Sequence, residues 1–232
     1  MARAFRATTR GYKADLETHE RRLISQLCAD VISLLERRGE QITDGAAESA
    51  ADQGSAAGDD VFAHFRRELA GLGVGLEDSA ASQEAEPAGL AAPEDPVLAR
   101  LLPEAAEDPQ EAAQLRRLTE ASLRESKLAG LRTARMLLES DPVTLTEEQA
   151  PIFGRALNDV RLTLATRLGI EDEADAEQIH QMAGSSQAAT TEQFMAEVYA
   201  FTTWLQETLF SAMLELLPDD GDEIGSAEEG AE

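Results

Sequence analysis

DPQEAAQLRRLTEASLRESKLAGLRTARMLL, residues 108–138, is the stretch that decides the fold. Asp108 is suited to cap a helix and Pro109 to open it, because proline is tolerated at the first helical position. The pair Asp141-Pro142 should stop the helix near residue 139, since the residue before a proline avoids the helical conformation. The stretch therefore predicts one long amphipathic helix around which the rest of the chain packs.

The flanking sequence predicts further helices with similar start and stop signals. Thr146 and Gln149 fit a capping box, in which each side chain bonds the other residue's backbone N–H. Gly39 is expected to end the helix that begins at Thr18. Asp95-Pro96 should open a short helical turn. The helices expected beyond residues 108–139 cover about residues 18–37, 61–72, 95–103, 146–168, 175–183 and 191–217.

The composition favours packed helices over a β-sandwich. Hydrophobic residues make up 43% of the 232 residues but aromatic residues only 4%, so the core must consist mostly of Leu, Ala and Val. Residues 4–16 read as two short extended pieces that turn near Gly11. We predict an all-α bundle of about four to six helices with a small N-terminal β-hairpin.

Two insertions and a tail are expected to lie outside this bundle. Residues 39–59 and 76–94 are rich in Ala, Gly, Ser and acidic residues and lack an apolar rhythm, which is typical of flexible linkers. Residues 218–232 form an acidic stretch with nothing to bury. We therefore expect a single helical domain over residues 1–217 followed by a disordered acidic tail.

The charge distribution limits the possible partners. The chain has 20 Lys and Arg against 45 Asp and Glu, a formal net charge of −25, and no Lys or Arg follows Arg167. Phosphate binding depends on clustered basic side chains, so nucleic acid is an unlikely partner for most of the surface. The basic side chains of residues 3–38 leave phosphate binding open for this segment. No apolar run approaches the roughly 20 residues that cross a bilayer, and no secretory signal is recognisable, so a soluble, cytoplasmic protein is expected.

Polar residues fall on or beside the predicted core faces. Glu120, Arg124 and Lys127 share a helix face with leucines, and Glu120 can pair with Arg124 four residues on. In the next helix Arg161 borders the core stripe, Asn158 lies further round, and Asp159 is expected towards the far face near Arg155. Two interpretations remain open: a buried hydrogen-bond network that fixes helix register, or a polar groove that binds a peptide or a small anion.

The last helix is predicted to have an unusually wide apolar arc. Phe194, Val198 and Phe201 begin one apolar line, and Gln206 lies in a second line beside it. An arc of this width indicates a helix that is buried on two sides or that also meets a partner. The residues expected at such an interface are Tyr199, Trp204 and Phe210.

Catalytic and metal-binding patterns are not recognisable in the sequence. His19, His64 and His180 show no metal-ligand spacing, and no phosphate loop, dinucleotide fingerprint or nucleophile elbow is present. Cys28, the single cysteine, lies on an apolar helix face and is expected to be a core residue. We expect no metal, no cofactor and no enzymatic activity.

Three short motifs resemble an actinobacterial family of unknown function, DUF2017. They are Asp95-Pro-Val-Leu-Ala-Arg-Leu-Leu-Pro103, Leu157-Asn-Asp-Val-Arg-Leu162 and Trp204-Leu-Gln-Glu207. The resemblance implies a helical, cytoplasmic protein without an established activity. It also implies a genomic setting beside an adaptor of the Clp protease, and a transcriptional-regulator label for some members. The recurrent polar positions that the resemblance implies here are Glu120, Arg124, Asn158, Asp159, Arg161 and Gln206.

Three functions remain open from the sequence. The preferred one is a non-enzymatic protein-interaction, adaptor or regulatory module, with a protein partner of unknown identity and a possible link to Clp proteolysis. The second is a DNA-binding regulator that uses the basic residues 3–38. The third is a small-ligand protein or enzyme built on the polar cluster, which would require its side chains to converge on one pocket. Homo-oligomerisation also remains possible.

Overall fold

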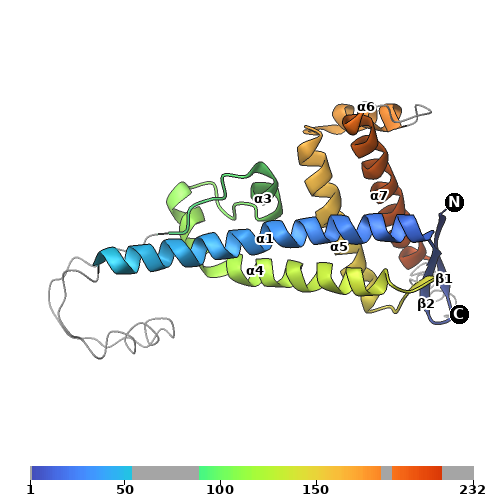
Figure 1. Cartoon of the computed structure of the whole chain (residues 1–232), viewed down its shortest axis with the longest axis horizontal. Helices are drawn as coiled ribbons and strands as arrows, with labels where there is room; N and C mark the ends of the chain where they lie inside the picture. Colours follow the sequence, from blue (N-terminus) through green and yellow to red (C-terminus); the bar gives the residue numbers. More distant parts are fainter. Residues whose placement is uncertain (1, 54–88, 184–189, 216–232) are drawn as a thin grey trace, which may run out of the picture.

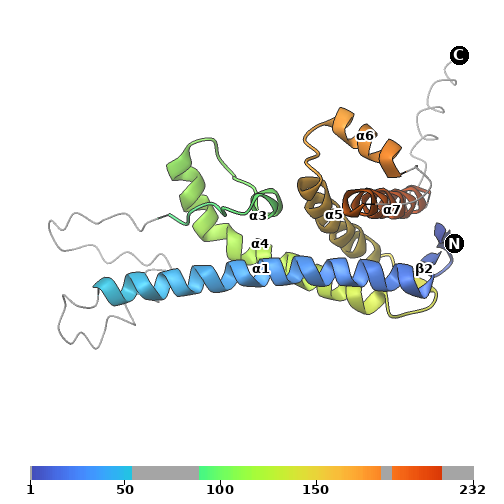
Figure 2. The same ribbon diagram turned by 45° about the horizontal axis from the view of Figure 1, so that its top comes forward.

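In the computed structural model, which describes residues 2–53, 89–183 and 190–215, two long helices form the spine of the molecule. Helix α1 (Thr18–Gln53) and helix α4 (Pro109–Leu137) lie side by side in both views (Figures 1 and 2). They run antiparallel, because Arg38 of α1 reaches Glu120 of α4 while Ser25 is reached by Arg135. Helix α5 (Gln149–Arg167) packs against both members of this pair.

Helices α5 and α7 form a second layer that crosses the spine near the start of α1 (Figure 1). Helix α7 packs on α5, on α6 and on strand β1, so its wide apolar arc is buried on more than one side. Leu157, Leu205 and Leu209 are fully buried in the core of this layer. The bounds of the helices beyond the spine are α3 Pro96–Leu101, α5 Gln149–Arg167, α6 Glu173–Ala183 and α7 Thr191–Leu214.

A three-stranded antiparallel sheet closes the end of the molecule where α1 begins. Strands β1 (Arg3–Thr8) and β2 (Gly11–Asp15) form the expected hairpin, and β3 (Val143–Leu145) adds to the free edge of β2. Gly11 has a φ of 113°, and a Cβ there would lie 2.1 Å from the Leu145 carbonyl oxygen. The turn and the third strand both require glycine at this position.

The predicted all-α bundle with a small N-terminal sheet is confirmed, with six helices among the described residues. The helix starts at Asp95 and Asp108 are also confirmed, since each carboxylate accepts bonds from two backbone N–H groups. Thr146 and Gln149 exchange the two bonds of a capping box, at 3.2 and 3.0 Å. Sequence reasoning missed β3, because a strand of three residues leaves almost no periodic signal.

The largest difference between the sequence prediction and the structure concerns the expected linkers. Residues 39–53 continue α1 as regular helix, so Gly39 does not end it. Alanine, glutamate and glutamine favour helix in this stretch, and Arg38 holds α1 to the rest of the molecule through Glu120. Residues 89–94 form no helix or strand but are placed by defined contacts, including Leu90 N–H to the Ala113 carbonyl at 2.9 Å.

Several sequence predictions fall outside the described residues. These are the rest of both linkers (54–59 and 76–88), the short helix at 61–72, the end of the last helix at 216–217, and the acidic tail at 218–232. The single domain over 1–217 stays a prediction. In the described part of the chain, every helix is too short or too polar to cross a membrane.

Candidate functional site

The first half of α4 carries a buried charge cluster that ties it to α1. The Glu120 carboxylate, 3% exposed, accepts a bond from Arg38 Nε at 2.8 Å and from Arg116 Nη1 at 3.2 Å. Arg38 also donates to the Ala91 carbonyl at 2.6 Å, and Arg116 to the Leu102 carbonyl at 2.9 Å. This sealed cluster fixes the register of two helices and the chain before α3, which is the structural role that the sequence left open.

Arg124 does not pair with Glu120 as the helical spacing suggested. Its guanidinium lies against α1, where a Cβ on Gly39 would come within 3.1 Å of its Cζ and Nε. The Nη1 atom is buried without a hydrogen-bond partner. Gly39 is therefore a point of close approach between α1 and α4, because any larger residue would push against the Arg124 side chain.

The second half of α4 carries a different ion pair, which ties it to α5. Lys127 Nζ lies 2.6 Å from Asp159 Oδ1, and Asp159 is 5% exposed. Asp159 thus lies on the α4-facing side of α5 and not on the far face, although Arg155 is close enough to act on its charge. Burial raises the pKa of Asp159 above its ordinary value, and this effect outweighs the Lys127 ammonium, which acts in the opposite direction.

A groove opens between α4 and α5 beside this ion pair, and we call it the α4/α5 groove. It encloses about 420 Å³. Apolar and polar side chains from both helices line it, a mixture that is typical of sites that bind amphipathic ligands. The lining residues are Leu123, Ser126, Lys127, Ala129, Gly130 and Thr133 of α4, and Ile152, Arg155, Ala156, Asn158 and Asp159 of α5.

Gly130 lies in the middle of α4 and lines the groove. A Cβ built there would meet only the Ile152 Cγ2 atom, at 3.9 Å, which is ordinary van der Waals contact. At Gly154 of α5, by contrast, a Cβ would lie 2.6 Å from the Phe210 ring. Glycine inside a helix costs about 1 kcal/mol relative to alanine. The packing of the described residues therefore gives no reason for glycine at position 130, which leaves a notch in the groove wall.

Helix α5 contributes Arg155, Asn158 and Asp159 to the polar part of the groove. Arg155 is exposed and makes no ion pair within the described ranges. The Asn158 Oδ1 atom accepts a bond from Arg161 Nη2 at 3.2 Å, while Arg161 Nε is buried without a partner. The structure thus brings Lys127, Asn158 and Asp159 to one groove, with Arg161 behind Asn158.

The other predicted site residues lie elsewhere. Gln206 is buried and donates to the Gly154 carbonyl at 3.2 Å, which joins α7 to α5. Tyr199 is 6% exposed and packs within the core of the chain. Trp204 is half-buried and stacks on Phe201, with ring centroids 5.9 Å apart. Of the three aromatic residues expected at an interface, Phe210 is the exposed one, at 40%.

Cys28 is a core residue as expected. Its side chain is fully buried, and burial raises the pKa of the thiol to about 12. Phe194 differs from the prediction, because it is 50% exposed and not part of the core stripe. Among the described residues, His, Cys, Asp and Glu side chains nowhere gather in threes to hold a metal ion.

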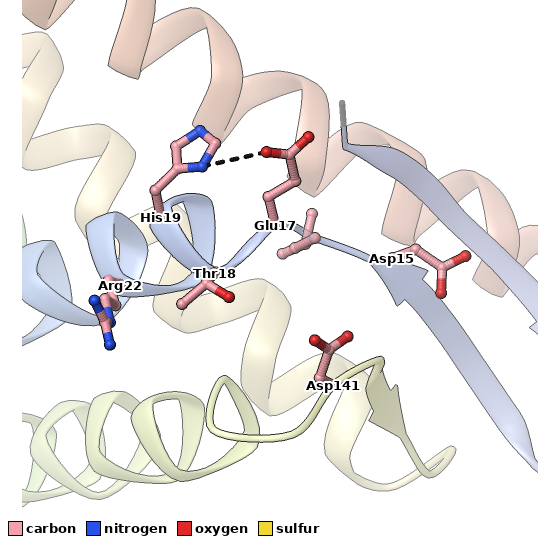
Figure 3. Close-up of a pocket in the computed structure, with 7 residues that line it drawn as sticks. Asp15, Glu17, Thr18, His19, Arg22 and Asp141 are labelled. Atoms are coloured by element: carbon pink, nitrogen blue, oxygen red, sulfur yellow. Dashed lines mark ion pairs between the residues drawn. The ribbon is translucent and has the colours of Figure 1, made fainter.

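A second hollow, of about 760 Å³, lies where β2 meets α1 (Figure 3). Its carboxylates belong to Asp15, Glu17 and Asp141, and Figure 3 shows them pointing in different directions. Glu17 lies 3.4 Å from His19 Nδ1, and Asp141 is held by Arg21 at 2.9 Å. These carboxylates are engaged separately and do not converge on a common ligand position.

Sequence reasoning missed four residues that define the two halves of α4. Arg38 and Arg116 complete the sealed cluster, while Gly130 and Arg155 shape the groove. Two signals were present in the sequence: Arg116 stands four residues before Glu120, and Gly130 interrupts a strong helical pattern. The contribution of Arg38 had no local signal, since it lies 82 residues before Glu120.

Comparison with known proteins gives one result. Residues 2–213 match the family model described as a domain of unknown function, DUF2017. The searches of curated proteins and of solved structures returned no match. Since the match spans most of the chain, the protein belongs to the DUF2017 family.

Proposed function

We propose that this protein is a non-enzymatic interaction module of the cytoplasm, and that the α4/α5 groove is the surface on which a partner protein docks. The observation that carries the proposal is the notch at Gly130. A helix that keeps a destabilising glycine without an internal packing reason is consistent with a contact that forms only when a partner is present.

The chemistry of the groove supports a protein ligand. Leu123 is 40% exposed at its rim, and Ala129 and Ala156 let another backbone approach closely. Interfaces commonly combine such an apolar centre with a polar rim. The Lys127–Asp159 pair is satisfied internally, so a partner would not have to neutralise a buried charge.

The alternative of DNA binding loses part of its basis, because four of the eight basic residues of the segment 3–38 are engaged within the chain. Within the basic segment 3–38, Arg6 and Lys13 both contact Asp15, and Arg21 pairs with Asp141. Arg38 is buried against Glu120. Basic side chains engaged in this way are poorly placed to neutralise phosphates.

The alternative of one polar pocket also weakens. Glu120 and Gln206 are buried in separate contacts, and neither lines the groove that Lys127, Asn158 and Asp159 share. A catalytic or ligand-binding constellation that needs all of these side chains cannot form from this arrangement. The groove remains as the place where a subset of them is accessible.

A quantitative pull-down from lysate of the native host, treated with nuclease, tests the proposed function. The full chain is compared with Gly130→Leu, which fills the notch, and with Gly45→Ala, a helical glycine of α1 with nothing within 4 Å of a Cβ. The proposal expects a partner that is recovered by the wild type and by Gly45→Ala but reduced at least fivefold by Gly130→Leu. Equal recovery by all three proteins contradicts it. A possible role of this partner in Clp proteolysis would then be read from its identity.

A further inference from the structure

The charges around the α4/α5 groove differ in sign from those of the molecule as a whole. The charged residues that line the groove are Lys127, Arg155 and Asp159, which sum to +1, whereas the whole chain carries −25. Asp159 is buried and bonded to Lys127, so the charge that reaches solvent at the rim is that of Arg155. A local positive site on a negative surface selects a ligand that carries negative charge at this one place.

The polar rim offers donors and few acceptors. The Asn158 Oδ1 atom is taken by Arg161, and the Asn158 amide nitrogen makes no hydrogen bond in the part of the chain that the structure describes. Arg155 adds a guanidinium, which pairs with carboxylates in a two-pronged geometry. Because the Asp159 carboxylate is buried and bonded to Lys127, these donors favour an acidic side chain in the ligand over a basic one.

The α4 wall of the groove has the length to receive a helix. From Leu123 to Thr133 this wall spans eleven residues, or about 15 Å at a rise of 1.5 Å for each step. That length matches about three turns of a docked helix. The small residues Ala129, Gly130 and Ala156 allow a third helix to approach the two that form the groove, as in other helix-in-groove complexes.

From these observations we propose that the occupant of the groove is an acidic amphipathic helix of a partner protein. Its apolar residues sit against Leu123, Ile152 and the notch at Gly130. A Glu or Asp one turn away pairs with Arg155 and accepts from Asn158. This inference rests on the proposed function, since it names the class of partner for the same groove.

The inference is tested by selection from a displayed library of random 16-residue peptides on the immobilised full chain. This selection does not require the partner to be identified first. The selected peptides are expected to carry Leu, Ile or Met at three- and four-residue spacing together with an excess of Asp and Glu. A synthetic copy of the best peptide should bind the wild type, with the affinity measured by fluorescence anisotropy.

Two variants and one control variant show where the peptide binds and whether its negative charge contributes to binding. Arg155→Glu should weaken the synthetic peptide roughly five- to tenfold, because an exposed ion pair becomes a repulsion. Arg117→Glu is the matched control, since Arg117 is also an exposed arginine on a helix but lies outside the groove. Gly130→Leu should abolish binding, and the circular dichroism of each variant verifies that it is folded.

The possible outcomes separate the two proposals. Peptides that are neutral or basic, yet lost in Gly130→Leu, overturn the acidic partner and leave the groove as a docking site. Peptides that bind Gly130→Leu as well as the wild type overturn both proposals. If no peptide is selected and the wild type forms a dimer that Gly130→Leu abolishes, the occupant is a second copy of this chain and the acidic partner is wrong.

Discussion

The two halves of α4 accommodate a buried charge in different ways. Glu120 lies in a closed cluster in which two arginines and two backbone carbonyls complete every contact. Asp159 has a single ammonium partner, Lys127, at the edge of an open groove. The comparison shows that a buried charge can be enclosed by several partners or can border a groove with a single partner.

The largest effect is expected from Glu120→Ala. The substitution leaves Arg38 and Arg116 buried without a counter-charge, which typically destabilises a protein by about 3–5 kcal/mol. Urea unfolding followed by circular dichroism measures the loss. Glu120→Gln keeps hydrogen-bond acceptance and should lose less. A loss below about 1 kcal/mol for Glu120→Ala would remove the distinction between a sealed and an open half of α4.

A smaller effect is expected from Lys127→Met. The variant keeps the packing of the lysine stem but leaves Asp159 without its ammonium. Because Asp159 borders a groove and can take up a proton, the loss in unfolding free energy at pH 7 should be about 1–3 kcal/mol. The same urea titration measures it. A loss as large as that of Glu120→Ala would show that Asp159 is shielded from solvent as fully as Glu120.

The pH dependence of stability sharpens the comparison further. The pKa of Asp159 is raised in the folded state, so between its unfolded value near 3.8 and its folded value the native protein binds more protons than the unfolded chain. In this window the contribution of Asp159 to stability falls as the pH rises, opposite to the usual behaviour of a paired carboxylate. The contribution is fully present below the unfolded pKa and is lost above the folded one.

Asp159→Asn tests this sign directly. Subtracting its stability profile between pH 3.5 and 7 from that of the wild type should leave a difference that declines with increasing pH. Glu125→Gln, which removes an exposed carboxylate of α4 outside the ion pair, serves as the control for the loss of one carboxylate. A wild-type advantage that grows with pH would mean that the Lys127 ammonium, and not burial, dominates at Asp159.

The smallest effect on stability is expected from alanine at the two open helical glycines. Gly130→Ala and Gly45→Ala should each stabilise the protein by about 0.5–1 kcal/mol, since neither new methyl group meets a clash. Thermal unfolding measures both. Gly130→Ala should weaken partner binding while Gly45→Ala leaves it unchanged. Equal binding by the two variants would indicate that the notch at Gly130 is not used.

Much of the fold could be predicted from the sequence because its signals are local. Asp95 and Asp108 act as caps at the expected places, and the helix of residues 108–138 follows its apolar stripe closely. Gly39 shows the limit of such signals. Glycine after a helix and glycine under a neighbouring arginine look the same in sequence, and only the approach of Arg124 distinguishes them.

The candidate site was predictable in part. The helical period placed Glu120, Arg124 and Lys127 on a core-facing stripe, which the burial of Glu120 confirms. The partners on other helices could not be predicted, because Arg38 and Asp159 lie 82 and 32 residues from the side chains they bond. Local spacing favoured the pair Glu120–Arg124, whereas in the structure Glu120 bonds Arg116 of the same helix and Arg38 of α1. The groove depends on the same packing and has no signal in sequence beyond Gly130.

Site-specific photo-crosslinking in cells of the native host tests most directly whether the α4/α5 groove is a docking site. A photoreactive phenylalanine analogue replaces Ser126 in the groove or, as a matched control, Ser33, an exposed serine of α1. The account predicts a discrete crosslinked protein from position 126 that is absent from position 33 and is lost when Gly130→Leu is added. No adduct at position 126, or the same adducts at both positions, would contradict it.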